Sequence, residues 1–455
     1  MLPPRPGVSD PKAGCAHNDG FGVGVHRFPR PSGYVILIPV KRPDIEAFDW
    51  DAGRWETGRP SRPALEIVFA ADWAPIRAFD APMARSPEAV YGDLLPILRA
   101  GDLRVVNVEC PLSDVGAPAV KSGSVFRGRP AHVAALTAVP FDVALMANNH
   151  VFDFGVESFE QTRALLEAHG LRTVGAGRNA AEAQRPLRLT ARGVRVGIVN
   201  FSEGEDLTAA GRGPGVFGWD PESVAAIVRR LRRGADAVIV VAHAGLEYIP
   251  FPPPYVADAF RRIADAGADL IVAHHPHVPQ GIEIRNGCPI CYSQGNFAFF
   301  QETDLHYRKV GFLLKAQLSG NGLHGIEIIP YRIGAAGLRR LRGGEARRFF
   351  GALRRVSMPL ARPDGVERAW HGFLRHYGLR GFREEVGRLM AILAEDPPKG
   401  AAMFRNRITT MQHREHWTDF LSRVMRGHLD RAPRAFVALA EEWLTRRCRA
   451  QSDRR

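Results

Sequence analysis

The chain has 455 residues, of which 45% are hydrophobic and 24% are charged, and it contains five cysteines. This composition excludes a largely disordered chain and a disulfide-stabilised scaffold, and the length is typical of two or three domains. No stretch reaches the roughly 20 apolar residues of a membrane span, and residues 1–30 lack the pattern of a signal peptide. The sequence therefore predicts a globular protein of the cytoplasm.

The net charge of +13 is concentrated in the C-terminal part of the chain. Residues 331–455 contain 27 basic and 13 acidic residues, whereas residues 1–330 contain 34 and 35. A basic segment can face nucleic acid, an anionic membrane surface or an acidic polymer. Its arginines alternate with acidic and apolar residues, which favours a solvated helical surface and argues against a nucleic-acid partner.

Three segments follow one another along the chain. Residues 1–62 are expected to form a weakly structured leader, because prolines interrupt any helix and no hydrophobic period appears. Strand-like and helical patterns then alternate, and a strand-rich stretch follows, which predicts a layered α/β domain over residues 63–335. The expected strands are 66–71, 103–108, 141–147, 195–201, 237–242, 269–273, 282–284, 290–293, 310–316 and 323–330, with helices at 156–169 and 255–267. Helical periodicity at 366–377, 417–425 and 434–444 predicts a small all-helical domain over residues 345–455.

Polar side chains gather directly after the apolar strands of the α/β segment. Five strands are followed in this way, by Asp72, by Glu109, by Asn148, Asn149 and His150, by His243, and by His274, His275 and His277. Ligands of open α/β sheets bind outside the carboxyl ends of the strands, so these groups are expected to share one crevice. Taken singly, each has a structural interpretation, such as a helix N-cap for Asp72 or a satisfied core histidine for His243.

The shared crevice has the donor chemistry of a metal site. Mixed oxygen and nitrogen donors suit a divalent cation such as Mn, Zn, Fe or Mg, and the lack of cysteine at these strand ends argues against a structural zinc site. A water bound to such a cation has its pKa lowered from 15.7 to about 7. His150 would then serve as a general acid or stabilise developing negative charge.

Four motifs carry a resemblance to a known family. They are ANNHVFDFG at 147–155, HAGLEY at 243–248, AHHPHV at 273–278 followed by Gln280 and Gly281, and YSQGNF at 292–297. Together they resemble the bacterial CapA family of capsule and poly-γ-glutamate synthesis proteins, which belongs with the calcineurin-like metallophosphoesterases. The resemblance covers about residues 65–331.

The resemblance implies an α/β fold, a four-layer αββα calcineurin-like metallophosphoesterase sandwich, with a cleft for one or two divalent ions. Its implied metal ligands are Asp72, Glu109, Asn149, His243, His275 and His277. Its implied catalytic residues are His150 and Asn149, and its implied substrate-binding residues are Lys121, Arg127, Asn148, Glu247, His274 and Asn296. The partners that it implies are an anionic polymer or phosphoester as substrate and other proteins of capsule synthesis, with a place at the cell envelope.

The chain departs from the pattern of these relatives at three positions. Metallophosphoesterases carry a histidine ligand two residues after the first aspartate, where this chain has Ala74. Ala71 replaces a usual glycine and Ala244 a usual tryptophan. One metal site is therefore expected to be weaker or differently ligated, and phosphatase activity does not follow from the resemblance alone.

Two further pairs of residues invite a metal or redox interpretation. Cys288 and Cys291 form a C-x-x-C within an expected strand and have no second pair, which favours a structural role. His413 and His416 lie one helical turn apart and are interpreted as surface residues beside Trp417.

Three functions remain open from the sequence. The first is a metal-dependent hydrolase or transferase that acts on an anionic polymer or its precursor. The second is a non-catalytic polymer-binding component of a capsule synthesis or export machine. The third, a phosphoesterase linked to nucleic acid, rests only on the basic C-terminal segment.

Overall fold

The computed structural model describes residues 44–58, 63–205 and 208–448. Most of the expected leader lies outside this part of the chain, but residues 44–58 correct the expectation of weak structure. Strand β1 (Arg54–Glu56) pairs with β16 (Gly322–Gly334), and Ile45, Phe48 and Trp55 are buried. The spacing of these three apolar residues fits neither a helix nor a strand, so the hydrophobic pattern of the sequence does not predict that they are buried.

Two mixed sheets form the centre of the molecule. The strands of the first sheet, in spatial order, are β1, β16, β15 (Val310–Ser319), β2 (Leu65–Ala74), β3 (Leu103–Val108), β4 (Val143–Leu145) and β5 (Arg172–Val174), with β14 (Asn296–Phe299) on β2 and β17 (Gly337–Arg340) on β16. Those of the second are β12 (Ile282–Arg285), β13 (Cys288–Cys291), β11 (Leu270–His274), β10 (Ala237–His243), β8 (Val194–Ser202) and β7 (Leu187–Ala191). A small third sheet pairs β6 (Ala176–Gly177) with β9 (Gly215–Val216).

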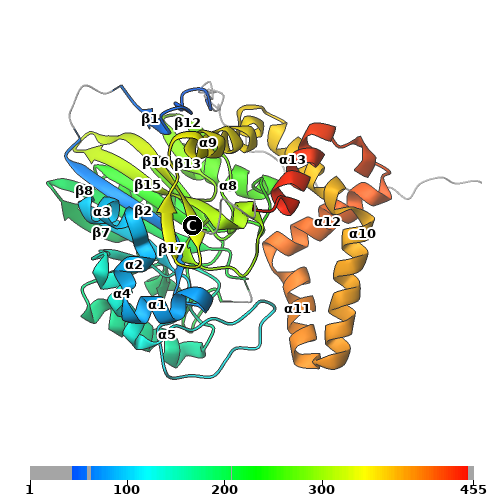
Figure 1. Cartoon of the computed structure of the whole chain (residues 1–455), viewed down its shortest axis with the longest axis horizontal. Coiled ribbons are helices and arrows are strands. Elements are labelled where there is room, and N and C mark those ends of the chain that lie inside the picture. Colours follow the sequence, from blue (N-terminus) through cyan, green and yellow to red (C-terminus); the bar gives the residue numbers. More distant parts are fainter. Residues whose placement is uncertain (1–43, 59–62, 206–207, 449–455) are drawn as a thin grey trace, which may run out of the picture. The chain divides into compact units, whose positions relative to one another are not determined.

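Helices surround the two sheets (Figure 1). Those of the α/β part are α1 (Asp80–Arg85), α2 (Pro87–Tyr91), α3 (Leu95–Ala100), α4 (Val133–Ala138), α5 (Gly155–Ala168), α6 (Ala180–Ala183), α7 (Pro221–Leu231) and α8 (Pro254–Asp265). The C-terminal ones are α9 (Gly343–Ser357), α10 (Gly365–Glu395), α11 (Pro397–Thr409), α12 (Met411–Met425) and α13 (Arg434–Thr445). No helix of the described residues is long and apolar enough to cross a membrane.

Alternating side chains of the strands produce a four-layer arrangement. Phe69 and Ile239 belong to a hydrophobic cluster between the two sheets, whereas their chain neighbours Val68 and Val240 point to the opposite faces. On those outer faces, α1–α5 cover the first sheet, and α7 and α8 cover the second. Strand residues alternate between faces, so one apolar strand supplies two layers of core. The four-layer αββα fold expected from the resemblance is confirmed.

The C-terminal helices continue from the last strand, near the boundary expected at residue 345. Phe349 and Phe350 of α9 join the cluster between the sheets, and α10 packs beside α11 and α13 (Figure 1). The helical period expected at 366–377 ends where α10 breaks at Gly378, whose φ is 60°. Helix α11 was not expected. That these helices form a domain of their own stays a prediction.

Candidate metal centre

Strand pairing brings the predicted polar residues to one place. Asp72 on β2 is the register partner of Asn107 on β3 and of Asn296 on β14. On the second sheet, His243 of β10 is the partner of His274 of β11. Asp72 lies two residues before the end of β2, Glu109 follows β3 directly, and β10 and β11 end at His243 and His274. The polar groups of each sheet meet at one edge, because β2 and β3 run parallel, as do β10 and β11. The expected crevice therefore gathers groups from both sheets.

Asp72 is fully buried, and one of its oxygens lacks a hydrogen bond. Oδ1 accepts a hydrogen bond from Asn107 at 2.8 Å, whereas Oδ2 has no hydrogen-bond partner among the described residues and lies 3.3 Å from Nδ1 of His277. Burial alone would raise the pKa of Asp72, but His277 and then His274 hold that pKa below its ordinary value. These neighbouring imidazoles therefore favour the ionised form of the carboxylate.

Glu109 has the clearest character of a metal ligand. Both of its carboxylate oxygens are buried and have no hydrogen-bond partner in the described part of the chain. The nearest imidazole nitrogens are Nε2 of His243 at 3.4 Å and Nε2 of His277 at 3.9 Å. Burial, and then the charge of Asp72, raise the pKa of Glu109 well above its ordinary value. Buried carboxylates are paired or bind metals, so this one fits a metal ligand.

Histidines complete the donor set. Nε2 of His243 lies 3.0 Å from Oδ1 of Asn149 and 3.1 Å from Nδ1 of His275. Burial and then the neighbouring imidazole of His275 hold the pKa of His243 well below its ordinary value, which favours the neutral, metal-binding form. Three sets of side chains each bring donor atoms within 4.8 Å of one another: Glu109 with His243 and His275; Glu247 with His275 and His277; and Asp72 with Glu109 and His277. The residues present therefore fit a divalent cation.

His150 contacts a buried pair of charged side chains, Asp153 and Lys121. Its Nδ1 lies 2.7 Å from Oδ2 of Asp153, and the ammonium of Lys121 donates to Oδ1 of Asp153 at 2.8 Å and to the carbonyl of Asn149 at 2.6 Å. The ring of Phe126 packs against His150 with centroids 4.4 Å apart. Lys121 was expected to bind substrate; the structure instead buries it beneath the Asn149–His150 turn.

The remaining predicted substrate-binding residues take different places. Arg127 is exposed and lies over the ring of Phe154, and it does not line the cavity described below. Asn148 is buried and donates to the carbonyl of Val108 at 2.9 Å. His274 and Asn296 are buried within the crevice. Oδ1 of Asn296 lies 2.8 Å from Nδ1 of His277, which belongs to two of the donor sets.

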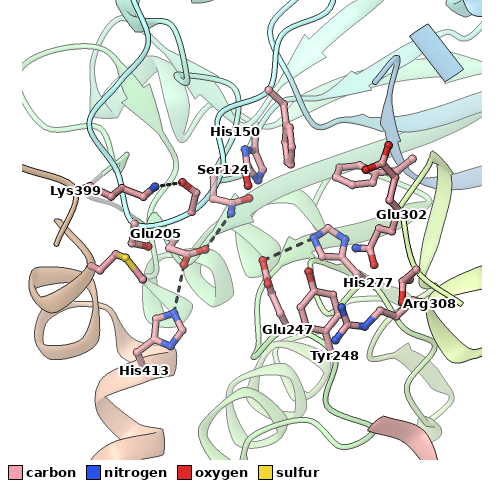
Figure 2. A pocket seen from close by; sticks show the side chains of 18 of the residues that line it. Ser124, His150, Glu205, Glu247, Tyr248, His277, Glu302, Arg308, Lys399 and His413 are labelled. Carbon is pink, nitrogen blue, oxygen red and sulfur yellow. Dashed lines mark hydrogen bonds and ion pairs between the residues drawn. The ribbon is translucent and has the colours of Figure 1, made fainter. Parts of the chain in front are cut away.

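Glu205, which the sequence patterns did not single out, lies behind the histidine cluster. It accepts hydrogen bonds from Asn149 at 3.0 Å and from Asn406 at 3.0 Å. It also lies 3.7 Å from His275 and 3.4 Å from His413, the latter contact being drawn in Figure 2. Burial would raise the pKa of Glu205, but His413 and His275 hold it well below its ordinary value.

The C-terminal helices correct the interpretation of two histidines. His413 is not an outer surface residue: it lines the cavity and faces Glu205 (Figure 2). His416 is buried against the rings of Trp370 and Phe373, and burial lowers its pKa to about 3. Their sequence spacing shows that they share a helix face, but only the folded chain shows what that face meets. The structural interpretation of Cys288 and Cys291 is supported, since both thiols are buried and free.

A cavity of about 620 Å³ adjoins this cluster, although Asp72, Glu109, His243 and His275 do not line it. Its inner wall includes Asn149, His150, Glu247 and His277 from the α/β part. Its other wall comes from α10–α12, so the C-terminal segment contributes directly to the site. The basic residues of the lining are Arg77, Arg308, Arg388, Lys399 and Arg407, together with His413. Of the six predicted substrate-binding residues, Glu247 lines this cavity.

Comparison with known proteins relates the chain to capsule synthesis. The PGA biosynthesis protein CapA of Bacillus subtilis is 30% identical over 306 residues, covering 66% of this chain and 80% of the relative. A probable polyglutamine synthesis accessory protein of Mycobacterium tuberculosis is 30% identical over 309 residues, covering 61% of this chain and 80% of the relative. Among solved structures, a 5′-nucleotidase precursor of Thermus thermophilus aligns with 66% of this chain and 58% of its own, at 17% identity and a TM-score of 0.36.

The family match covers the part of the chain that contains the crevice. Residues 66–301 match the family described as Bacterial capsule synthesis protein PGA_cap. This range begins with β2 and ends after β14, so it includes Asp72, Glu109 and all the histidines of the three donor sets. The resemblance inferred from the four motifs is confirmed: the chain belongs to the PGA_cap family of bacterial capsule synthesis proteins.

Proposed function

We propose that this chain is a metal-dependent hydrolase or transferase of capsule or poly-γ-glutamate biosynthesis, acting on an anionic polymer or a phosphoester. Membership of the family supports the biosynthetic role. The observation that carries the catalytic proposal is Glu109, whose two buried oxygens have no hydrogen-bond partner in the described residues and face imidazoles. A divalent cation would neutralise this carboxylate, because Asp72, His243, His275 and His277 place further donors around it.

Such a cation would lower the pKa of a water to about 7, providing a nucleophile at neutral pH. The protein's own contribution is to hold the substrate and to move a proton. Asp153 occupies Nδ1 of His150, which leaves Nε2 as the nitrogen free to give or accept a proton. Lys121 fixes Asp153 from behind, so the imidazole keeps one orientation. His150 would then protonate the leaving group or stabilise the charge that develops on the substrate.

Metal content tests this proposal on the full chain. We expect wild type to bind about one or two equivalents of Mn, Zn or Fe by ICP-MS, and the His275→Ala/His277→Ala variant to lose them. His169→Ala is the matched control, because this exposed histidine at the end of α5 belongs to none of the donor sets. Circular dichroism verifies that all three proteins fold.

Activity on γ-glutamyl polymers and phosphoesters is then measured with the loaded protein. Cleavage or transfer that disappears in the double variant supports a hydrolase or transferase. If folded wild type takes up none of these metals, the catalytic proposal is wrong. The basic cavity would then favour a non-catalytic component that holds an anionic polymer.

A further inference from the structure

The guanidinium of Arg308 stacks on an aromatic ring at the wall of the cavity. Arg308 belongs to the short 3-10 helix His306–Lys309, and its Cζ lies 3.4 Å from the centroid of the Tyr248 ring. Figure 2 shows the two side chains together, with His277 beside Tyr248. The ring centroids of Tyr248 and His277 are 5.9 Å apart, so the ring of Tyr248 lies between Arg308 and a histidine of the donor sets.

Arg308 is half-buried and has no side-chain hydrogen bond or ion pair to any described residue. Tyr248 covers one face of the guanidinium, but stacking leaves the N–H groups at its edge available. Burial lowers the pKa of Arg308, with Tyr248 and Glu247 opposing that effect. A guanidinium remains charged at neutral pH, so its donors are unused inside a cavity.

Of the other cationic side chains that line the cavity, all but Arg388 have a hydrogen-bond or ion-pair partner in the described part of the chain. Arg407 donates to Glu385 at 2.7 Å, Lys399 donates to the carbonyl of Gly123 at 2.6 Å, and Arg77 donates to the carbonyl of Phe300 at 3.0 Å.

Arg388 of α10 also lines the cavity and, like Arg308, has no side-chain partner in the part of the chain that the structure describes. The α/β part and the helical part thus each offer one unpaired guanidinium to the same space.

Resting on the function proposed above, we propose that Arg308, stacked on Tyr248, binds an oxyanion of the substrate other than the group that reacts at the metal centre. The edge of a guanidinium matches the two oxygens of a carboxylate or a phosphate, which it can bind through two parallel hydrogen bonds. Arg388 faces the same cavity from α10 and adds a second positive charge for a neighbouring anionic unit. The ligand class is therefore a chain with repeated negative charges, rather than a single anion.

Isothermal titration calorimetry on the full chain tests this subsite with defined probes. The probes are γ-linked tetraglutamate, which supplies carboxylates, and inorganic tripolyphosphate, which supplies phosphates, each compared with glutamate or orthophosphate. The variants are Arg308→Gln and Arg308→Lys, the second of which keeps the charge but not the planar fork. Arg229→Gln is the matched control, since it removes one exposed positive charge from α7, outside the cavity.

We expect Arg308→Gln to weaken binding of one of the two multi-anionic probes by about tenfold or more, as the loss of a charge-assisted hydrogen bond does. Binding of glutamate and orthophosphate should be unchanged, and Arg308→Lys should recover only part of the loss. The probe that is affected identifies the oxyanion as carboxylate or phosphate. If wild type binds neither probe, or if Arg308→Gln binds both as tightly as Arg229→Gln does, the subsite is wrong.

The titrations are repeated on metal-free protein in chelator to separate this subsite from the proposed catalysis. Arg308 needs no metal ion to bind an oxyanion, so the effect of its substitution should persist in metal-free protein. A wild-type protein that takes up no metal but keeps the Arg308 effect would contradict the catalytic proposal and leave the subsite supported. If wild type binds metal but Arg308→Gln has no effect, the subsite is contradicted and the catalytic proposal is still supported.

Discussion

The carboxylate oxygen Oε2 of Glu205 lies 3.7 Å from Nε2 of His275, on a ring whose other nitrogen lies 3.1 Å from His243. His275 is therefore placed between the histidine cluster and an outer carboxylate. A distance of 3.7 Å is too long for a hydrogen bond, so this contact is electrostatic, and the side-chain amide of Gln412 lies closer to Nε2 of His275, at 3.3 Å. A carboxylate behind a metal-binding histidine raises the basicity of the ring. Because Asn406 of α11 and His413 of α12 contact Glu205, the helices beyond residues 66–301 support the candidate centre.

Replacing Glu205 should weaken metal binding without removing a member of the donor sets. For Glu205→Gln we expect the affinity for Mn²⁺ to fall by about 10- to 100-fold, measured by competition with a fluorescent chelator. Glu302→Gln is the control, because Glu302 is an exposed acid of the same cavity. Equal affinities of the two variants would show that the charge of Glu205 does not support metal binding by His275.

The sequence predicted the crevice well because strand ends are local features. Asp72, Glu109 and His243 each follow an apolar run, and parallel pairing places the carboxyl ends of these strands at one edge of each sheet. Glu205 and His413 had no comparable signal, since their meeting depends on how α12 packs against a loop more than 200 residues earlier in the chain. Lys121 resembled a ligand-binding cation by position, yet burial beside Asp153 gives its charge an internal partner.

The pair formed by Lys121 and Asp153 should be important for stability. Both side chains are buried, so removing one charge leaves the other without compensation. We expect Lys121→Met to lower the free energy of unfolding by about 3–5 kcal/mol in urea titrations. Lys315→Met, which removes the partner of the more exposed Glu66, should cost less than about 1 kcal/mol. Similar losses in both variants would contradict the role assigned to Lys121.

Glu385 should make the helical segment sensitive to acid. It accepts hydrogen bonds from Arg407 and Trp417, joining α10 to α11 and α12. Burial would raise its pKa, but Arg407 and Tyr377 lower it to about 2. The pKa is depressed in the folded state, so the stabilisation is complete above the ordinary value near 4.5 and is lost as the pH falls from there to about 2.

For Glu385→Gln we therefore expect a loss on the order of 3 kcal/mol at pH 7, since each pKa unit corresponds to about 1.4 kcal/mol. The difference between wild type and variant should shrink between pH 4.5 and pH 2, measured by urea unfolding at several pH values. A difference independent of pH would show that Glu385 acts through packing alone.

Glu109→Gln should have opposite effects with and without metal. In the metal-free protein, burial raises the pKa of Glu109 well above its ordinary value, so the buried carboxyl group costs free energy at pH 7 whether it stays ionised or takes up a proton. The neutral glutamine avoids this cost, so the free energy of unfolding should rise by about 1–3 kcal/mol. With Mn²⁺ at 100 times its dissociation constant, wild type should gain about 2.7 kcal/mol, whereas the variant should gain little. Urea unfolding in chelator and in Mn²⁺ measures both effects.

Glu56→Gln is the control for this pair of measurements, because Glu56 is exposed on β1. It should leave both the metal-free stability and the gain with Mn²⁺ within about 0.5 kcal/mol of wild type. A variant at Glu109 that destabilises the metal-free protein would mean that the carboxylate is held by protein contacts. The two unpaired oxygens would then need no cation, and Asp72 and the histidines would have to form the centre without Glu109.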